Sequence, residues 1–410
     1  MIDLGSAVGL TCRECGATYE LGAAYACMEC FGPLEVAYDF PALTRADIEA
    51  GPTSLWRYRA LLPVRPTAAE EANLAPGWTR LHRADNLAAE LGMRSLWVKD
   101  DSGNPTHSFK DRVVAVAQSA ARALGLTTLA CASTGNLAHA VAAAAACGGQ
   151  ESVVVIPHDL EAGKTITTAT YGGTLIAVEG NYDDVNRLCS EIIGEDFSAF
   201  WGFVNVNIRP YYAEGSKSMG YEIAEQLGWR TPAQVVAPIA SGSLLTKVDK
   251  AWRELAALGL IEESPYAVFG AQAQGCSPVS QAFDAGWDIV KPVKPATIAK
   301  SLAIGNPADG PYALDVVRRT GGSIAAVSDE DVVDGIRLLA RTEGIFAETA
   351  GGVVVATLRH LLKEGSLDPD AETVILNTGE GLKTLDAVMD FARPTATIKP
   401  DVDAVRALVV

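Results

Sequence analysis

The sequence predicts an α/β protein built on parallel sheets, with a small cysteine-rich module in front of it. Two observations predict the sheets. Short apolar runs recur along the chain, and amphipathic stretches of helical length separate them. A third observation, two closely spaced cysteine pairs within the first thirty residues, predicts the module. Because the alternation is long for one sheet, we expect two parallel-sheet α/β lobes with a cleft between them.

Composition limits the classes of protein to which the chain belongs. With 410 residues, of which 49% are hydrophobic, it is long enough to bury a large core. The 33 Lys and Arg against 50 Asp and Glu give a net charge of −17, which argues against a nucleic-acid binder. No apolar run is long enough for a membrane span, and the first residues lack the pattern of a signal peptide. We expect a cytoplasmic protein with neither a nucleic-acid nor a membrane partner.

The first element is the cysteine-rich module, assigned to residues 1–40. Cys12 and Cys15 form one CxxC pair, and Cys27 and Cys30 form a second. Two such pairs suit the tetrahedral shell of Zn²⁺, and four sulfur ligands leave no open position, so the metal is expected to be structural. The alternatives are two disulfides, which a cytoplasmic location disfavours, and an accidental clustering of cysteines.

The remaining residues, 41–410, carry the α/β body. We expect the smaller lobe at about 110–205 and the larger lobe at about 55–109 plus 206–395. Strands are expected at 96–99, 128–131, 153–156, 175–178, 203–206, 235–239, 267–270 and 373–376. Helices are expected at 108–124, 136–147, 182–193, 214–227 and 329–342, and a further helix is expected after residues 240–244, running to about 258.

Ligands of open α/β sheets lie beyond the carboxyl ends of the strands, so the residues that follow each strand deserve inspection. Lys110 opens a helix after the first strand. It is either a surface lysine or an amine suited to a Schiff base with a carbonyl cofactor. Ser133, Thr134 and the following Gly-Asn open the next helix, as a carboxylate cradle or a plain N-cap.

Two later strands end in small residues. Residues 240–244 have the small side chains and free N–H groups of a phosphate-binding turn. They match neither the GxxxxGK[ST] pattern of nucleotide-binding P-loops nor the GxGxxG pattern of dinucleotide-binding folds, which argues against ATP and NAD. Thr378 follows the last strand, where its hydroxyl could bond a ring nitrogen. Each segment could also be an ordinary loop. Together, a Schiff-base lysine and a phosphate cradle fit one cofactor, pyridoxal 5′-phosphate.

At this point the chain resembles the threonine synthase family, within the tryptophan-synthase-β-like (fold-type II) pyridoxal-phosphate enzymes. The resemblance runs from about Gly51 to Met389. The segments that carry it are NPTHSFKDR (104–112), STGN (133–136), PYYAEGSKS (210–218), APIASGSLL (237–245), SLAIGNPADG (301–310), ARTEGIFAETAGG (340–352) and LNTGEGLKT (376–384).

The resemblance implies a role for each matching residue. Lys110 would form the Schiff base, with Phe109 beside the cofactor, and Asn136 would bond its phenolic oxygen. Thr378 would face the pyridine nitrogen, and Ser133 and Thr134 would hold the substrate carboxylate. The cofactor phosphate would be wrapped by Ala240, Ser241, Gly242, Ser243 and Leu244. The cofactor would therefore lie in the cleft between the two lobes.

The implied activity is conversion of O-phospho-L-homoserine and water to L-threonine and phosphate by a homodimeric lyase of threonine biosynthesis. Lys110 would also remove the α-proton of the substrate and later return a proton to Cα. The expected cations for the substrate phosphate are Lys164, Arg209, Lys217 and Arg112.

Two histidines and three rival functions stay open. His107 stands where the family commonly has a small residue, and it either lines the substrate path or simply packs. His139 is interpreted as a helix-surface histidine in preference to a site residue. The rivals are a threonine or serine dehydratase, a replacement enzyme on O-phosphoserine (cysteate-synthase-like), and a non-catalytic metabolite-binding protein. Lys110 argues against a metabolite-binding protein, because binding alone does not require this lysine.

Overall fold

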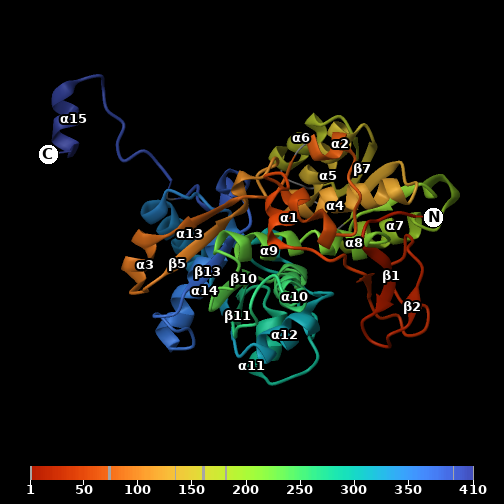
Figure 1. Cartoon of the computed structure of the whole chain (residues 1–410). Helices are drawn as coiled ribbons and strands as arrows, with labels where there is room; N and C mark the ends of the chain where they lie inside the picture. Colours follow the sequence, from red (N-terminus) through yellow and green to blue (C-terminus); the bar gives the residue numbers. More distant parts are fainter. Residues whose placement is uncertain are drawn as a thin grey trace.

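The computed structural model describes residues 2–72, 75–133, 135–158, 162–180, 182–390 and 392–409. In these ranges the chain forms three sheets, a small one at the N-terminus and two larger ones in the body (Figure 1). No helix in these ranges is long and apolar enough to cross a membrane. The α/β prediction is confirmed.

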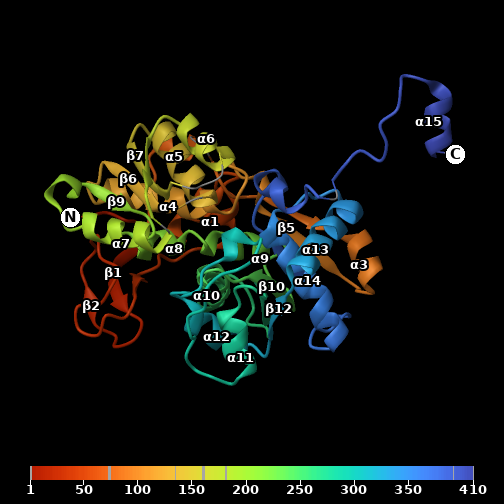
Figure 2. The ribbon, with the colours of Figure 1, turned by 180° about the vertical axis from the view of Figure 1, so that it is seen from behind.

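The N-terminal module is a three-stranded antiparallel sheet. Its strands are β1 (Ala7–Cys12), β2 (Thr18–Tyr19) and β3 (Leu34–Tyr38), in the order β2-β1-β3. The module lies on the opposite side of the body from the C-terminal helix (Figure 2). Its buried contact with the body includes a hydrogen bond of 2.7 Å from the Tyr38 hydroxyl to Glu214.

A four-stranded parallel sheet follows, in the order β8-β7-β6-β9. Its strands are β6 (Thr128–Ala132), β7 (Glu151–Pro157), β8 (Thr174–Val178) and β9 (Trp201–Phe203). Its helices are α4 (Lys110–Ala123), α5 (Asn136–Gly148), α6 (Ala162–Thr170) and α7 (Tyr182–Ile192). Every residue of β6 is buried, as expected for a strand covered on both faces.

The second body sheet has six strands in the order β12-β11-β10-β13-β5-β4. They are β4 (Arg80–Arg83), β5 (Leu96–Asp100), β10 (Gln234–Pro238), β11 (Ala267–Ala273), β12 (Ile324–Val327) and β13 (Thr373–Asn377). All neighbours are parallel except β4, which pairs antiparallel with β5 at the sheet edge. This strand escaped prediction because its sequence, Arg-Leu-His-Arg, is too polar to signal a strand. The sheet is therefore mixed.

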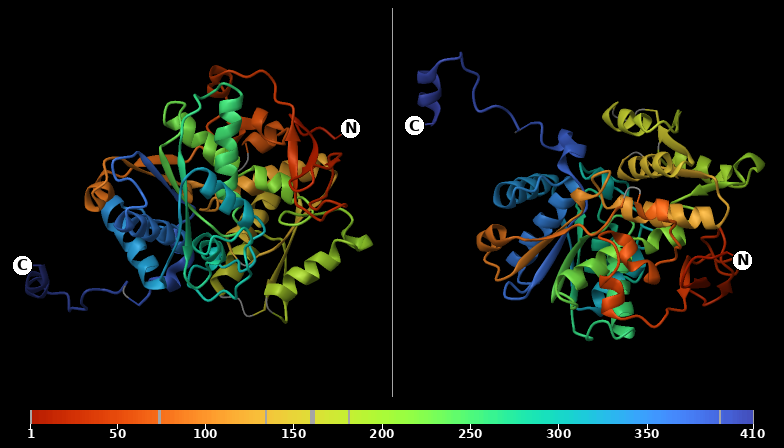
Figure 3. Two further views of the ribbon diagram at one scale, coloured as in Figure 1. Left: turned by 90° about the horizontal axis from the view of Figure 1, so that it is seen from below. Right: turned by 45° about the horizontal axis from the view of Figure 1, so that its top comes forward.

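The remaining helices cover and connect these sheets. They are α1 (Arg45–Glu49), α2 (Ala68–Ala72), α3 (Asp85–Leu91), α8 (Arg209–Glu214), α9 (Lys217–Gln226), α10 (Ser243–Ala257), α11 (Pro278–Asp284), α12 (Gly310–Arg319), α13 (Asp329–Glu343), α14 (Thr349–Glu364) and α15 (Val402–Val409). Short 3-10 helices lie at Leu55–Leu61, Asp101–Gly103, Asp196–Ser198, Lys300–Leu302 and Gly381–Ala387. Helix α15 stands away from the body in every view (Figure 3).

Two expected boundaries are wrong. The strand expected at 203–206 is Trp201–Phe203. The helix expected at 214–227 starts at Lys217, because the chain breaks between α8 and α9 at Gly215. A Cβ at Gly215 would lie 2.6 Å from the Val113 Cα, so α8 packs directly against the backbone of α4 at this break. The break holds the helix that precedes it close to Lys110.

Candidate active site

The segment before Lys110 is joined to the loop after β13. The Phe109 N–H donates to the Thr378 carbonyl oxygen over 2.9 Å, and Ser108 forms an antiparallel bridge with Gly379. The Glu380 N–H donates to the His107 carbonyl oxygen over 3.1 Å. These bonds place the start of α4 beside the end of β13, so two segments distant in sequence form one site.

Lys110 lies half-buried at the start of α4 and points toward α8. Its Nζ donates a hydrogen bond of 3.1 Å to the Tyr212 hydroxyl. It also lies 5.0 Å from the centre of the Phe109 ring. Tyr212 was not predicted, although it lies within a segment that carries the family resemblance. Its hydroxyl is the group through which α8 contacts the lysine.

A second cluster gathers around Asn136 at the start of α5. Its Nδ2 donates to Glu348 Oε2 over 2.8 Å, and its Oδ1 accepts from Lys383 Nζ over 3.0 Å. The Thr378 hydroxyl donates to Glu348 Oε1 over 3.4 Å. Glu348 and Lys383 were not predicted. This cluster joins the N-terminus of α5, from the four-stranded sheet, to the loop after β13 in the six-stranded sheet.

Burial shifts the charges of this cluster toward neutrality. It raises the pKa of Glu348 above its ordinary value, although the Asn136 amide and the Lys383 ammonium act in the opposite direction. Burial lowers the pKa of Lys383, and the carboxylates of Glu348 and Asp111 oppose that change. Burial also raises the pKa of Asp111 to about 6, against hydrogen bonds from Thr106. Shifted pKa values of this kind gather at functional sites, which supports a site at this cluster.

The predicted phosphate turn joins β10 to α10. Gly242 has φ +94°, and a Cβ there would lie 2.7 Å from the Asp309 carbonyl oxygen, so the turn requires glycine. The Asp309 N–H donates to the Ser241 carbonyl oxygen over 2.8 Å. The Ser243 hydroxyl is buried and has no hydrogen-bond partner among the residues that the structure describes. A buried donor of this kind at a helix N-terminus fits a phosphate oxygen.

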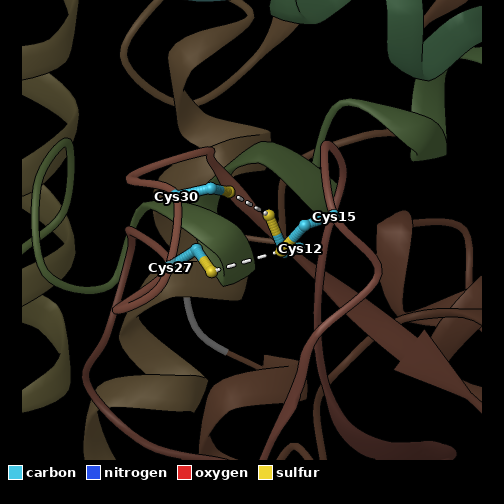
Figure 4. A group of neighbouring side chains, drawn as sticks. All are labelled: Cys12, Cys15, Cys27 and Cys30. Atoms are coloured by element: carbon cyan, nitrogen blue, oxygen red, sulfur yellow. Dashed lines mark hydrogen bonds between the residues drawn. The ribbon is translucent and has the colours of Figure 1, made fainter.

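The four N-terminal cysteines converge (Figure 4). Their sulfur atoms all lie within 4.8 Å of one another, and the Cys12–Cys30 and Cys15–Cys27 separations are 3.5 and 3.6 Å. A Zn²⁺ ion bound at ~2.3 Å by four sulfurs in a tetrahedron keeps neighbouring sulfurs about 3.8 Å apart. The four thiols therefore fit such an ion, and all four are free of disulfide bonds.

For two of the four cations, the prediction that they bind the substrate phosphate is wrong. Arg112 is buried and bonded to Asp101 and Glu222, with Nη1 2.5 Å from Glu222 Oε1. Lys217 is equally buried, with its Nζ 2.7 Å from Glu214 Oε2. Neither side chain reaches a ligand, because each already neutralises carboxylates inside the protein.

The other candidates lie in different settings. Arg209 pairs with Asp309, beside the phosphate turn. Ser133 is half-buried at the end of β6. Thr134 lies outside the described residues, and Lys164 falls in the first turn of α6 with its side chain outside them.

The two histidines differ from each other. His107 is exposed and has φ +61°, a left-handed conformation that favours glycine over other residues. His139 was interpreted as a surface residue, which is wrong. Only 5% of it is exposed, and its Nδ1 lies 3.5 Å from Lys383 Nζ. The apolar residues around it in α5 are buried on every side, which explains the burial of His139.

Residues 72–379 match the family described as pyridoxal-phosphate dependent enzyme. A threonine synthase of Methanocaldococcus jannaschii is 35% identical, with 96% of this chain and 98% of that protein covered. A threonine synthase of Bacillus sp. (strain ULM1) is 31% identical over 86% of this chain and 96% of that protein.

Solved structures share the fold at lower identity. Maize serine racemase superposes with a TM-score of 0.63 at 22% identity, over 78% of this chain and 94% of its own. An O-ureido-L-serine synthase gives a TM-score of 0.62 at 19% identity, over 84% of this chain and all of its own.

Proposed function

The chain belongs to the pyridoxal-phosphate dependent enzymes, and we propose that within this family it is a threonine synthase. It converts O-phospho-L-homoserine and water to L-threonine and phosphate. The observation that carries this function is the match to curated threonine synthases over nearly the whole chain. The arrangement of Lys110, Asn136 and Thr378 around one site supports it.

The residues that would hold the cofactor surround this site. Lys110 would bind its aldehyde carbon and Thr378 its ring nitrogen, while Asn136 would donate to its phenolic oxygen. The N–H groups of residues 241–244 and the buried Ser243 hydroxyl would hold the phosphate. The bound cofactor supplies an electron sink for the carbanions of the reaction.

The protein's own task is to move protons. The reaction removes protons from Cα and Cβ, expels phosphate from Cγ, adds water at Cβ and returns protons to Cγ and Cα. Lys110 Nζ, once released from the cofactor, is the base and acid for Cα. The Tyr212 hydroxyl, 3.1 Å from that Nζ, orients the amine and accepts its hydrogen bond.

The substrate anions need separate partners. We propose that Ser133 and Thr134 bind the carboxylate, and that Arg209 and Lys164 bind the phosphate. Arg209 is the first residue of α8, and three residues later Tyr212 contacts Lys110, so both side chains share one face of the helix. His107, on the exposed turn before Lys110, borders the substrate path.

Lys383 is proposed as a positioning residue for Asn136. Because Lys383 donates to Oδ1, the Nδ2 end of the amide is held in the direction required for donation to an oxygen acceptor. Lys383→Met is expected to lower kcat roughly tenfold, since a hydrogen bond to a charged group contributes ~1.5–3 kcal/mol. Lys383→Arg should restore part of this loss, and the exposed Lys363→Met serves as the control. Unchanged kcat and cofactor absorption in Lys383→Met would remove Lys383 from the site.

The direct test of function is product analysis with O-phospho-L-homoserine. Equal amounts of threonine and phosphate are expected. Phosphate with 2-oxobutyrate would assign elimination without capture of water. Absence of phosphate would favour a replacement reaction on O-phosphoserine, while cofactor absorption that responds to borohydride would still distinguish an enzyme from a metabolite-binding protein.

The cysteine module is proposed to hold one structural Zn²⁺. Its four sulfurs fit the ion, and the Glu14, Glu29 and Gly32 N–H groups each point at a cysteine sulfur over 3.4 Å, which stabilises thiolates. Metal analysis of the purified protein is expected to give one zinc per chain, and Cys27→Ser should lower that content and the melting temperature. Full zinc content in Cys27→Ser would contradict a four-cysteine site.

We propose a cytoplasmic homodimer with a metal-binding module at residues 1–40. The smaller lobe would span about 110–205, and the larger lobe about 55–109 plus 206–395. Light scattering of the purified protein tests the dimer.

A further inference from the structure

The two cysteine pairs of the N-terminal module face different surroundings. The residues between Cys12 and Cys15 contact the body, whereas Met28 and Glu29, between Cys27 and Cys30, are exposed. Met28 is 81% exposed. We call residues Cys12–Cys15 the first knuckle and residues Cys27–Cys30 the second knuckle. The first knuckle therefore contacts the body, and substitutions in the exposed second knuckle can serve as controls for substitutions in the first.

The first knuckle grips the start of α12. The Arg13 guanidinium lies 3.6 Å from the centre of the Tyr312 ring and 3.9 Å from Asp309 Oδ1. The Tyr312 hydroxyl donates to the carboxylate of Glu14. A guanidinium stacked on an aromatic ring beside a carboxylate is a directed contact, which a flexible surface charge does not make.

Residues 309–312, at the start of α12, also pack against the phosphate turn at residues 240–244. The Asp309 N–H donates to the Ser241 carbonyl oxygen, and the Asp309 carbonyl carbon lies 2.8 Å from where a Cβ of Gly242 would be. The Asp309 carboxylate pairs with Arg209. Residues 309–312 are therefore held between the first knuckle and the turn that begins α10.

A second connection reaches the same helix. Glu35 on β3 lies 3.4 Å from Arg13 and 2.6 Å from Lys247 Nζ on α10. Burial alone would raise the pKa of Glu35, but the charges of Lys247, Lys250 and Arg13 outweigh it and lower that pKa to about 2. Glu35 is therefore charged at neutral pH, and the module holds α10 one turn beyond its N-terminus.

We propose that Arg13 and Glu14 are positioning residues for the cofactor phosphate, through which the metal-loaded module strengthens cofactor binding. The inference rests on the proposed function, because it takes residues 240–244 as the phosphate site. Metal binding by Cys12 and Cys15 fixes the backbone of the first knuckle, and the knuckle in turn fixes residues 309–312 against Gly242. The module thus acts on cofactor affinity and leaves proton transfer at Lys110 untouched.

The test compares two cofactor forms. Pyridoxal lacks the phosphate of pyridoxal 5′-phosphate but keeps the aldehyde that reacts with Lys110. Each is titrated into cofactor-free, zinc-loaded protein, and its Kd is read from the absorption of the bound form. Arg13→Ala is expected to raise the Kd for pyridoxal 5′-phosphate about tenfold, the size of losing a partly buried cationic contact, and to leave the Kd for pyridoxal unchanged.

Matched variants separate positioning from damage to the fold. Met28→Ala, in the second knuckle, should bind both forms as the unchanged protein does, and Arg13→Lys should recover part of the affinity. Tyr312→Phe removes only the bond to Glu14 and should raise the Kd for pyridoxal 5′-phosphate less than Arg13→Ala does. It keeps the test available if Arg13→Ala fails to fold. Zinc content and melting temperature confirm that each variant is intact.

Three results would overturn the inference. An unchanged Kd for pyridoxal 5′-phosphate in both Arg13→Ala and Tyr312→Phe would show that the contact positions nothing. An equal loss for pyridoxal and pyridoxal 5′-phosphate would show general damage in place of a phosphate-specific effect. If the unchanged protein binds neither form, the proposed function fails together with the inference, whereas either of the first two results leaves that function standing.

Discussion

Replacing Lys110 with Ala is expected to lower turnover of O-phospho-L-homoserine by at least about 10³-fold, since a positioned acid–base group alone contributes 10²–10⁴-fold. Two functions are lost with one side chain, because the same Nζ binds the cofactor and carries the substrate's α-proton. In the structure this amine is oriented by a hydrogen bond of 3.1 Å to the Tyr212 hydroxyl. The measurement is the rate of threonine formation at saturating substrate.

Two controls make the Lys110 result interpretable. The exposed Lys363→Ala should keep full activity. The Lys110→Ala variant should keep its melting temperature, because the lysine side chain is half-buried and its one hydrogen bond within the described part of the chain goes to Tyr212. It should also lose the absorption band of the bound cofactor that borohydride removes. More than a tenth of normal turnover in a folded Lys110→Ala protein would refute the assignment.

Replacing Arg112 with Met is expected to lower the free energy of unfolding by about 3–5 kcal/mol, as removal of one partner from a buried ion pair does. Arg112 is fully buried two residues beyond Lys110. Its guanidinium bonds the carboxylates of Asp101 and Glu222, the hydroxyl of Thr79 and that of Ser218. The variant leaves two buried carboxylates, of which Glu222 keeps its ion pair with Lys99 at 2.7 Å.

Lowering the pH should also remove the stability that this network contributes. Burial would raise the pKa of Glu222, but the charges of Arg112 and Lys99 outweigh it and lower that pKa to about 2. A carboxyl whose folded pKa lies below its unfolded value stabilises the fold above the unfolded pKa of 4.5. That stability is lost as the pH falls from about 5 toward 2. Urea unfolding of the unchanged protein should show this loss, and Arg112→Met should show less of it.

The exposed pair of Arg187 and Glu191 offers a control for Arg112. Arg187 lies 3.1 Å from Glu191 on α7, and its side chain is 66% exposed. Arg187→Met should therefore change the free energy of unfolding by at most about 1 kcal/mol. Equal effects of the two substitutions would contradict the account of the buried network.

Much of the fold could be predicted because strands covered on both faces contain runs of consecutive apolar residues. β6, β7, β10 and β13 are of this kind, and each was placed within a residue or two. Edge strands such as β4 carry no such signal. The comparisons confirm the family that the motifs predicted.

The segments that meet at the candidate site were expected from their positions after strands, and the roles of their residues stay predictions. Thr378 directly follows β13, Asn136 follows β6 at the start of α5, and Lys110 starts α4, the first α-helix after β5. Hydrogen bonds from Phe109 to Thr378 and through Glu348 bring these segments of the two sheets together. Glu348 follows no strand, and a bridge between Ala347 and Glu380 brings it into the site.

The errors among the cations have one cause. Arg112 and Lys217 were expected at the substrate phosphate because they lie near helix starts. Arg112 pairs with Glu222 and Lys217 pairs with Glu254 as well as with the nearby Glu214, and a sequence does not show the pairing with a distant segment. His139 is different, because the unbroken apolar residues around it were a readable sign of burial.

The measurement that tests the central claim most directly is the reaction in water labelled with heavy oxygen. If the protein is a threonine synthase, water adds to Cβ while the ester oxygen leaves from Cγ with the phosphate. Mass spectrometry should then find the label in the threonine hydroxyl and none in the released phosphate. Label in the phosphate, with homoserine as the other product, would mean hydrolysis of the phosphate ester and would contradict the account.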